Sequence, residues 1–100
     1  MVTTLLSNVT STGVSLAKTP VIDASKTFQA IVSGTGAVSA TVAVEVSNNN
    51  TDFLTLGTIT LSGTTTVTDG FASFATWSFV RGNVTAISGT GATVTLVMGI

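Results

Sequence analysis

The segment SATVAVEVS at residues 39–47 alternates strictly between two kinds of side chain. In an extended chain, Val42, Val44 and Val46 fall on one face, and Thr41, Ala43 and Glu45 fall on the other. β-Branched residues with a period of two are typical of a strand that is buried on one face. A helix would need apolar spacing of three and four positions sustained over ~11 residues, and no segment of the sequence shows this.

Similar alternation runs through most of the chain. It recurs at 27–33, 53–62, 78–87 and 92–98, and more weakly at 3–7, 13–17 and 64–68. Turn-forming residues separate these segments at 33–36, 47–52, 62–65, 68–70 and 88–91. No segment sustains helical spacing, so we expect little or no helix. Strands separated by turns at intervals of about 8 to 12 residues predict an antiparallel β-sandwich or barrel.

We therefore predict an all-β protein, an antiparallel β-sandwich of about seven or eight strands. Both a jelly-roll and an immunoglobulin-like topology fit, because periodicity does not reveal strand order. One hundred residues suit a single domain. We expect residues 27–100 to form the core of the sandwich. The less regular residues 1–26 would be either an arm that orders against a neighbour or edge strands. Gly57 is expected at a β-bulge, and Pro20 at an edge or in a connection.

The sequence Ser-Gly-Thr-Gly occurs twice, at 33–36 and at 88–91. Two glycines with this spacing occur in nucleotide-binding loops, where a helix that starts at the loop holds the phosphate. Here Gly34 and Gly36 are followed by strand periodicity, and no lysine stands where a P-loop needs one. We therefore interpret both copies as the turns of β-hairpins, in which glycine supplies positive φ values.

The chain carries few charges. Only 7% of its residues are charged, against about 25% in an ordinary soluble domain, and the formal net charge is −1. So few cations cannot form the basic stripe that nucleic acids require, and they cannot coat an anionic membrane. A surface of hydroxyl groups is cheap to desolvate because no ion must be stripped of water. This favours a protein that packs against neighbours, although a lightly charged monomer is the alternative.

The sequence contains few residues that could catalyse a reaction. Histidine, cysteine and tyrosine are absent, which removes most nucleophiles and general bases. Asp52 and Asp69 lie in predicted turns and could converge, but aspartate is a common turn residue. Asn48, Asn50 and Asp52 could offer oxygen ligands to calcium, although one carboxylate without a central glycine is a poor calcium loop. We expect no enzyme activity, no cofactor and no metal.

Aromatic side chains cluster at Phe71, Phe74, Trp77 and Phe79. They could fill one end of the core, anchor a protein partner, or form a platform for sugar rings. Arg81 follows them, and we expect it at a sheet edge or interface, paired with a carboxylate or capping carbonyl groups. The candidate interface and loop-tip residues are therefore Asn48, Asn49, Asn50, Asp52, Trp77 and Arg81.

Residues 27–99 resemble the small β-sandwich virion proteins of tailed bacteriophages. The resemblance is carried by SGTGAVSATV, by VEVSNNNTDFLTLGTIT, by the run W-x-F-V-R-x-N-V-T-A-I-S-G-T-G and by ATVTLVM. It implies a structural protein of the virion, assembled in the host cytoplasm. Such a protein decorates or cements the phage head by contacting the major capsid protein or other virion proteins, commonly as a homo-oligomer. No catalytic residue is implied.

The middle of the chain also resembles jelly-roll modules that bind carbohydrate. The shared feature is a strand followed by an Asn-rich loop, an aromatic residue and the sequence Leu-Gly-Thr, which ends at Thr58 in this chain. The alternative function is therefore a tail or fibre module that binds host carbohydrate. The N-terminus has no basic or long apolar region of a signal peptide, and no apolar run of ~18 residues could span a membrane. We accordingly expect the protein to be made and kept in a cytoplasm.

Overall fold

The computed structural model describes residues 2–15, 17–19, 25–74 and 76–99, and every regular element among them is a β-strand. The strands are β1 (Val2–Val9), β2 (Gly13–Val14), β3 (Lys26–Ser47), β4 (Leu54–Ser73) and β5 (Phe79–Gly99). They form one antiparallel sheet in the order β1-β5-β3-β4, and β2 pairs with β5 beside this path. The all-β, antiparallel prediction is confirmed.

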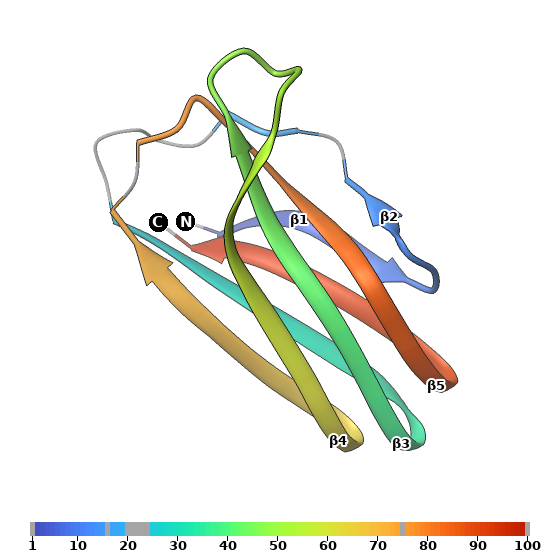
Figure 1. The fold of residues 1–100 in the computed structure, drawn as a ribbon. Helices are drawn as coiled ribbons and strands as arrows, with labels where there is room; N and C mark the ends of the chain where they lie inside the picture. The colour runs from blue at the N-terminus through green and yellow to red at the C-terminus, as the bar shows by residue number, and fades with distance from the viewer. Residues whose placement is uncertain (1, 16, 20–24, 75, 100) are drawn as a thin grey trace.

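Strands β3, β4 and β5 are 20 to 22 residues long, and each bends back on itself near its middle (Figure 1). The sheet therefore folds into two layers. The layer that contains β2, here called the β2 layer, also holds residues 37–47, 54–62 and 79–87. The layer that contains β1, called the β1 layer, holds residues 26–33, 66–73 and 92–99. The three bends, at 33–37, 62–66 and 88–91, lie together at one end of the molecule, called the bend end (Figure 1).

Because of these bends, the number of strands in the structure is smaller than the predicted number. The described residues form five strands rather than seven or eight, because pairs of predicted strands are halves of one strand. The segments 27–33 and 39–47, for example, both belong to β3, and β3 keeps the same neighbours on both sides of its bend. Alternation has the same period on either side of a bend and of a hairpin turn, so the sequence pattern alone does not separate the two.

The hairpin interpretation of Ser-Gly-Thr-Gly is wrong for the same reason. Each copy lies within a continuous strand, and the strand halves on either side of it pair with other strands. Glycine is needed because Gly36 and Gly91 have φ values of 72° and 63°, in the left-handed region. The turn predicted at 68–70 is also wrong, since Asp69 lies inside β4 opposite Ala30.

Two other local predictions are met. The turn predicted at 47–52 is present, because residues 48–53 form the loop that connects β3 to β4. The bulge expected at Gly57 is also present: Val44 pairs with Gly57 but Glu45 pairs with Thr55, which leaves Leu56 as the extra residue of β4. Pro20 lies outside the described residues.

The core lies between the two layers. One cluster contains buried side chains of both layers, among them Phe28, Val32, Leu96 and Met98 from the β1 layer and Val42, Val44, Ile59, Leu61, Val80 and Val84 from the β2 layer. Burying such a side chain contributes roughly 1.5–3 kcal/mol. The layers approach closely where a side chain is missing. A Cβ atom on Gly82 would lie 2.6 Å from Leu96 Cδ2 and 2.8 Å from Leu6 Cδ1.

The two edges of the sheet differ. On one side, β4 is the edge strand in both layers. On the other side, β1 is the edge of the β1 layer, while the N-terminal segment pairs with β5 in the β2 layer. There the amide of Ser15 donates to the carbonyl of Gly82 at 2.8 Å, and Lys18 and Val80 exchange backbone hydrogen bonds.

Candidate interaction surface

The loop from Ser47 to Phe53 is held together by its own side chains. The Oγ atom of Ser47 accepts hydrogen bonds from the amides of Asn49 and Asn50, each at 3.1 Å. The Oδ1 atom of Asn49 accepts from the amides of Thr51 and Asp52, at 3.0 and 2.9 Å. The hydroxyl of Ser47 also donates to this Oδ1 atom at 2.8 Å. Asn49 is therefore the structural centre of the loop.

The remaining candidates of this loop differ in what they contact. Asp52 Oδ2 accepts from Asn49 Nδ2 at 3.0 Å, within the loop. Asn48 Oδ1 accepts from the amide of Ser78 at 3.3 Å and so ties the loop to the start of β5. Asn50 is exposed and has a left-handed backbone with a φ of 58°. The structure thus gives Asn49 and Asp52 contacts within the loop, as in a loop rich in Asx turns, and gives Asn48 a contact to the segment before β5.

Asp52 and Asp69, which the sequence places in predicted turns, make separate contacts in the structure. Asp69 Oδ1 accepts from the amide of Gly70 at 2.8 Å, within β4, while Asp52 bonds inside the loop. Among the described residues, no group of three or more His, Cys, Asp and Glu side chains could hold a metal ion. The same residues include no helix long and apolar enough to cross a membrane.

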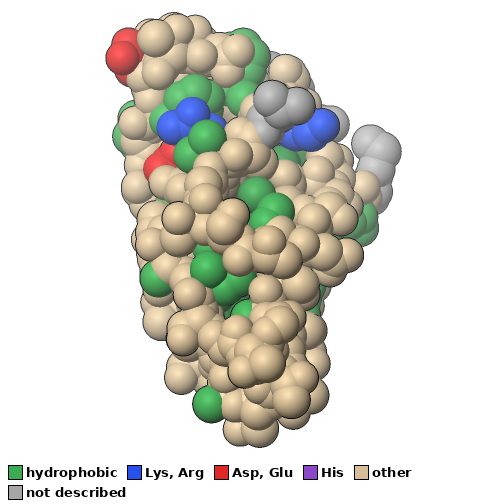
Figure 2. Space-filling view, turned by 90° about the vertical axis from the view of Figure 1, so that its right-hand side faces the viewer, with side chains coloured by type: hydrophobic (Ala, Val, Ile, Leu, Met, Phe, Trp, Pro, Cys, Tyr) green, Lys and Arg blue, Asp and Glu red, His purple; other side chains and the backbone are tan. Residues whose placement is uncertain are grey.

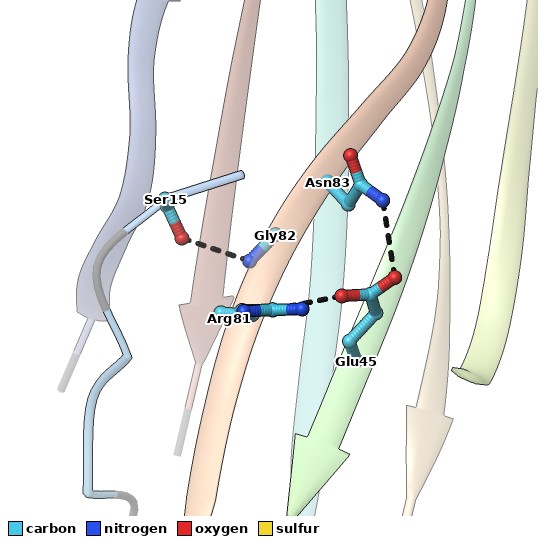
Figure 3. Close-up of polar contacts among 5 residues, drawn as sticks. All are labelled: Ser15, Glu45, Arg81, Gly82 and Asn83. Carbon is cyan, nitrogen blue, oxygen red and sulfur yellow. Dashed lines mark hydrogen bonds and ion pairs between the residues drawn. The ribbon is translucent and has the colours of Figure 1, made fainter. Parts of the chain in front are cut away.

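Arg81 forms the main polar cluster of the β2 layer, drawn in Figure 3. Its Nε atom donates to Glu45 Oε1 at 2.8 Å, and Asn83 Nδ2 donates to Glu45 Oε2 at 3.0 Å. The guanidinium carbon also lies 3.9 Å from the centre of the Phe53 ring. Glu45 and Arg81 are partners across neighbouring strands, so the fold brings them together directly. The expected pairing of Arg81 with a carboxylate is present.

The aromatic cluster of the sequence divides in the structure. Phe71 and Trp77 pack partly buried against the core, and the Phe71 ring lies 5.1 Å from the ring of Phe28. Phe74, by contrast, is 81% exposed and directly follows the end of β4. Trp77 is therefore partly used by the core, and Phe74 is the aromatic ring that the fold leaves to solvent.

The bend end has no charged side chain. Residues 27–44, 53–68 and 82–100 carry no charge, and all three bends lie within them. In Figure 2 the coloured charged groups lie toward one end of the visible face, and the other end is formed by uncharged groups. The exposed residues there are mostly serines, threonines and glycines, together with Ala37; among them are Thr35, Gly36, Thr64, Thr65, Ser88, Thr90 and Gly91. This surface loses water at low cost because it contains no ion.

The candidates that the sequence missed are residues whose role depends on pairing. Glu45 was identified only as an outward residue of a strand, because its partner Arg81 is 36 residues away. Phe53 was noted only as the aromatic that follows the Asn-rich loop. The uncovered edge of β4 has no signal of its own in the sequence, since edge and central strands can share one alternating pattern.

Comparisons with known proteins show a likeness of fold to a solved structure. No family model matches the chain, and no curated protein matches it. The solved structure titled "Crystal structure of PBSX exported protein XepA" matches 98% of this chain with a TM-score of 0.55 and 13% sequence identity. This chain spans 36% of the length of that protein. At this identity the match shows a shared fold.

Proposed function

We propose that this chain is a non-enzymatic structural protein of a tailed-phage virion, and most specifically a decoration or cement protein of the head. The observation that carries this proposal is the bend end, an exposed surface mostly of hydroxyl residues and glycines that has no charged side chain. Such a surface suits docking on a neighbouring protein. The likeness of the fold to an exported protein of the phage PBSX supports the same setting.

The proposed mechanism is mechanical. The folded sheet serves as a stiff β-sandwich scaffold, because three long strands cross both layers and share one core. Docking of the bend end onto the major capsid protein or another virion protein buries about 800 Å² per partner in an ordinary interface. Many copies on one shell would add to each other through avidity. The protein would accordingly be located in the virion, after assembly in the host cytoplasm, and would act as a homo-oligomer.

Binding to empty capsids of the phage that encodes the chain tests this proposal. The variant T35K/T90K places two lysines at the bend end, where Thr35 and Thr90 are partners across β3 and β5. We expect it to bind capsids at least about tenfold more weakly, since each buried lysine must lose its hydration. The control T51K adds a lysine to the exposed loop at the other end and should bind like the wild type. Failure of the wild-type protein to bind capsids would refute the proposal.

One observation favours the alternative, a tail or fibre module that binds carbohydrate. Phe74 is 81% exposed, and an exposed ring can stack on a sugar. Under this alternative, host glycans would bind the wild-type protein, and F74A would abolish the binding. Under the cement proposal, glycans would not bind and F74A would dock on capsids normally.

A further inference from the structure

The edge formed by β4 lacks the usual protection over part of its length. One side of β4 pairs with β3 from Leu54 to Ser73, and no described strand pairs with its other side. An edge strand with free backbone groups can accept another strand. Natural edges avoid this with charges, prolines or bulges, so the positions of such features show which part of the edge is open.

Two features close the ends of this edge and leave its middle open. In the β1 layer, the segment 66–73 carries the exposed carboxylate of Asp69, and a charge on an edge strand opposes pairing with another strand. In the β2 layer, the bulge at Leu56 interrupts the start of β4. Between them, Gly57–Gly63 pairs with β3 without any register shift, and its sequence GTITLSG has neither charge nor proline. The open part of the edge is therefore Gly57–Gly63.

The opposite edge of the same layer is occupied by the chain itself. β2 pairs with β5 at Asn83 and Val84, and the Oγ atom of Ser15 accepts from the amide of Gly82 at 2.9 Å (Figure 3). Lys18 continues this cover at Val80. The outer strand on this side is therefore β2, which is only two residues long and offers little backbone to a second copy. Gly57–Gly63 is the longer regular edge of the layer, and its pairing with itself gives a closed two-fold dimer.

The sequence of the open segment is complementary to itself in antiparallel pairing. With the two-fold axis at Thr60, Thr58 of one copy faces Ser62 of the other, and Ile59 faces Leu61. Thr58 and Ser62 are exposed, whereas Ile59 and Leu61 are 3% and 1% exposed in the core. Residues opposite each other in an antiparallel pair share a face. Hydroxyls thus meet hydroxyls, apolar side chains meet apolar ones, and no like charges meet.

We propose that two copies of this chain associate by antiparallel pairing of Gly57–Gly63 around a two-fold axis near Thr60. The pairing joins the β2 layers of both copies into one continuous sheet and leaves the bends at 33–37 and 88–91 of both copies exposed. Its use in a virion rests on the proposed function, but the pairing itself is a property of the isolated protein. Solution measurements therefore test it separately from capsid binding.

Sedimentation equilibrium of the isolated protein over a range of concentrations tests the pairing. In the variant T58K/T60K, the lysine at position 60 of one copy lies opposite the lysine at position 60 of the other, and the lysine at position 58 faces Ser62, diagonal to that pair. Like charges in facing positions oppose pairing. The control T85K/S88K adds the same charge at exposed positions of β5, away from this edge. We expect a dimer for the wild type and the control, and dimerisation at least about tenfold weaker in T58K/T60K.

The contrary results are equally definite. A wild-type protein that stays monomeric, or that grows into open assemblies, would overturn the proposal. The proposal would also fail if T58K/T60K dimerised as tightly as the control. Circular dichroism and urea unfolding of each variant establish that the subunits are folded, so that lost pairing is not confused with lost structure. Normal dimerisation with absent capsid binding would count against the proposed function alone.

Discussion

Thr35, in the middle of the first Ser-Gly-Thr-Gly segment, lies opposite Thr90, in the middle of the second. The two copies are therefore side by side, at the bends of the neighbouring strands β3 and β5. A related segment, Ser-Gly-Thr-Thr at 62–65, forms the bend of β4. Three related Ser-Gly-Thr segments thus lie at the bends of three adjacent strands, at the same end of the sheet. The repeat reflects a shared bend in a sheet. Gly36 and Gly91 have the left-handed backbone in their bends, and Thr65 has it in the bend of β4.

The bends make a specific prediction for Gly34. A Cβ atom there would lie 2.8 Å from Val38 Cγ1 and 3.0 Å from the carbonyl oxygen of Thr90. We expect Gly34→Ala to lower the free energy of unfolding by about 1–3 kcal/mol, because the added methyl group overpacks the bend. Urea unfolding gives this value. The exposed neighbour provides the control, since Thr35→Ala should stay within about 0.5 kcal/mol of the wild type. Equal stability of both variants would show that the bend can accommodate a methyl group at position 34.

In the loop from Ser47 to Phe53, substitutions at the adjacent residues Asn49 and Asn50 should have different effects on the free energy of unfolding. Asn49→Ala removes the acceptor of two backbone amides and should cost about 1–2 kcal/mol of unfolding free energy. Asn50→Gly should be neutral or slightly stabilising, because glycine adopts the left-handed backbone without strain. Thermal unfolding monitored by circular dichroism ranks the variants. If Asn50→Gly destabilised as much as Asn49→Ala, the side chain of Asn50 would have a role that its contacts do not show.

The pair of Glu45 and Arg81 is expected to contribute modestly. The side chains are 15% and 27% exposed, so water screens their attraction in part. A double-mutant cycle with Glu45→Gln and Arg81→Met should give a coupling energy of about 0.5–1 kcal/mol. Urea unfolding at low and high salt measures it, and the coupling should fall as salt increases. A coupling that is zero at low salt would mean that the contact has no net effect on stability.

Phe71 in β4 and Phe74 just after it should differ in how much their truncation lowers the free energy of unfolding. Phe71 packs on the core and against Phe28, so Phe71→Ala should lower the free energy of unfolding by about 2–4 kcal/mol. Phe74 is exposed, so Phe74→Ala should change it by less than about 0.5 kcal/mol. Chemical denaturation of both variants is sufficient. A large loss of stability in Phe74→Ala would show that this ring packs on the protein in solution.

The all-β class and most strand positions could be predicted because alternation is a local property of the sequence. Val42, Val44 and Val46 are all buried, as their spacing predicts. The folding of β3 at Gly36 could not be predicted, because a bend and a hairpin turn share glycine and a positive φ. What separates them is pairing with β4 and β5, which involves residues far apart in the sequence.

The candidate surface was predictable only in part, for a similar reason. The absence of charge is a property of composition, so a docking protein could be inferred from the sequence. Where that surface lies depends on the fold, which gathers the uncharged bends at one end and leaves β4 at an edge. Trp77 was chosen for its residue type, yet the fold packs it against the core and exposes Phe74 instead.

Cryo-electron microscopy of the purified virion tests the central claim most directly. The account predicts density for this chain on the head shell, with the bends at 33–37, 62–66 and 88–91 against the major capsid protein and the Ser47–Phe53 loop directed away from it. Density on the tail or fibre would support the carbohydrate-binding alternative in place of the cement function. Absence of the chain from purified particles would contradict a structural role in the virion.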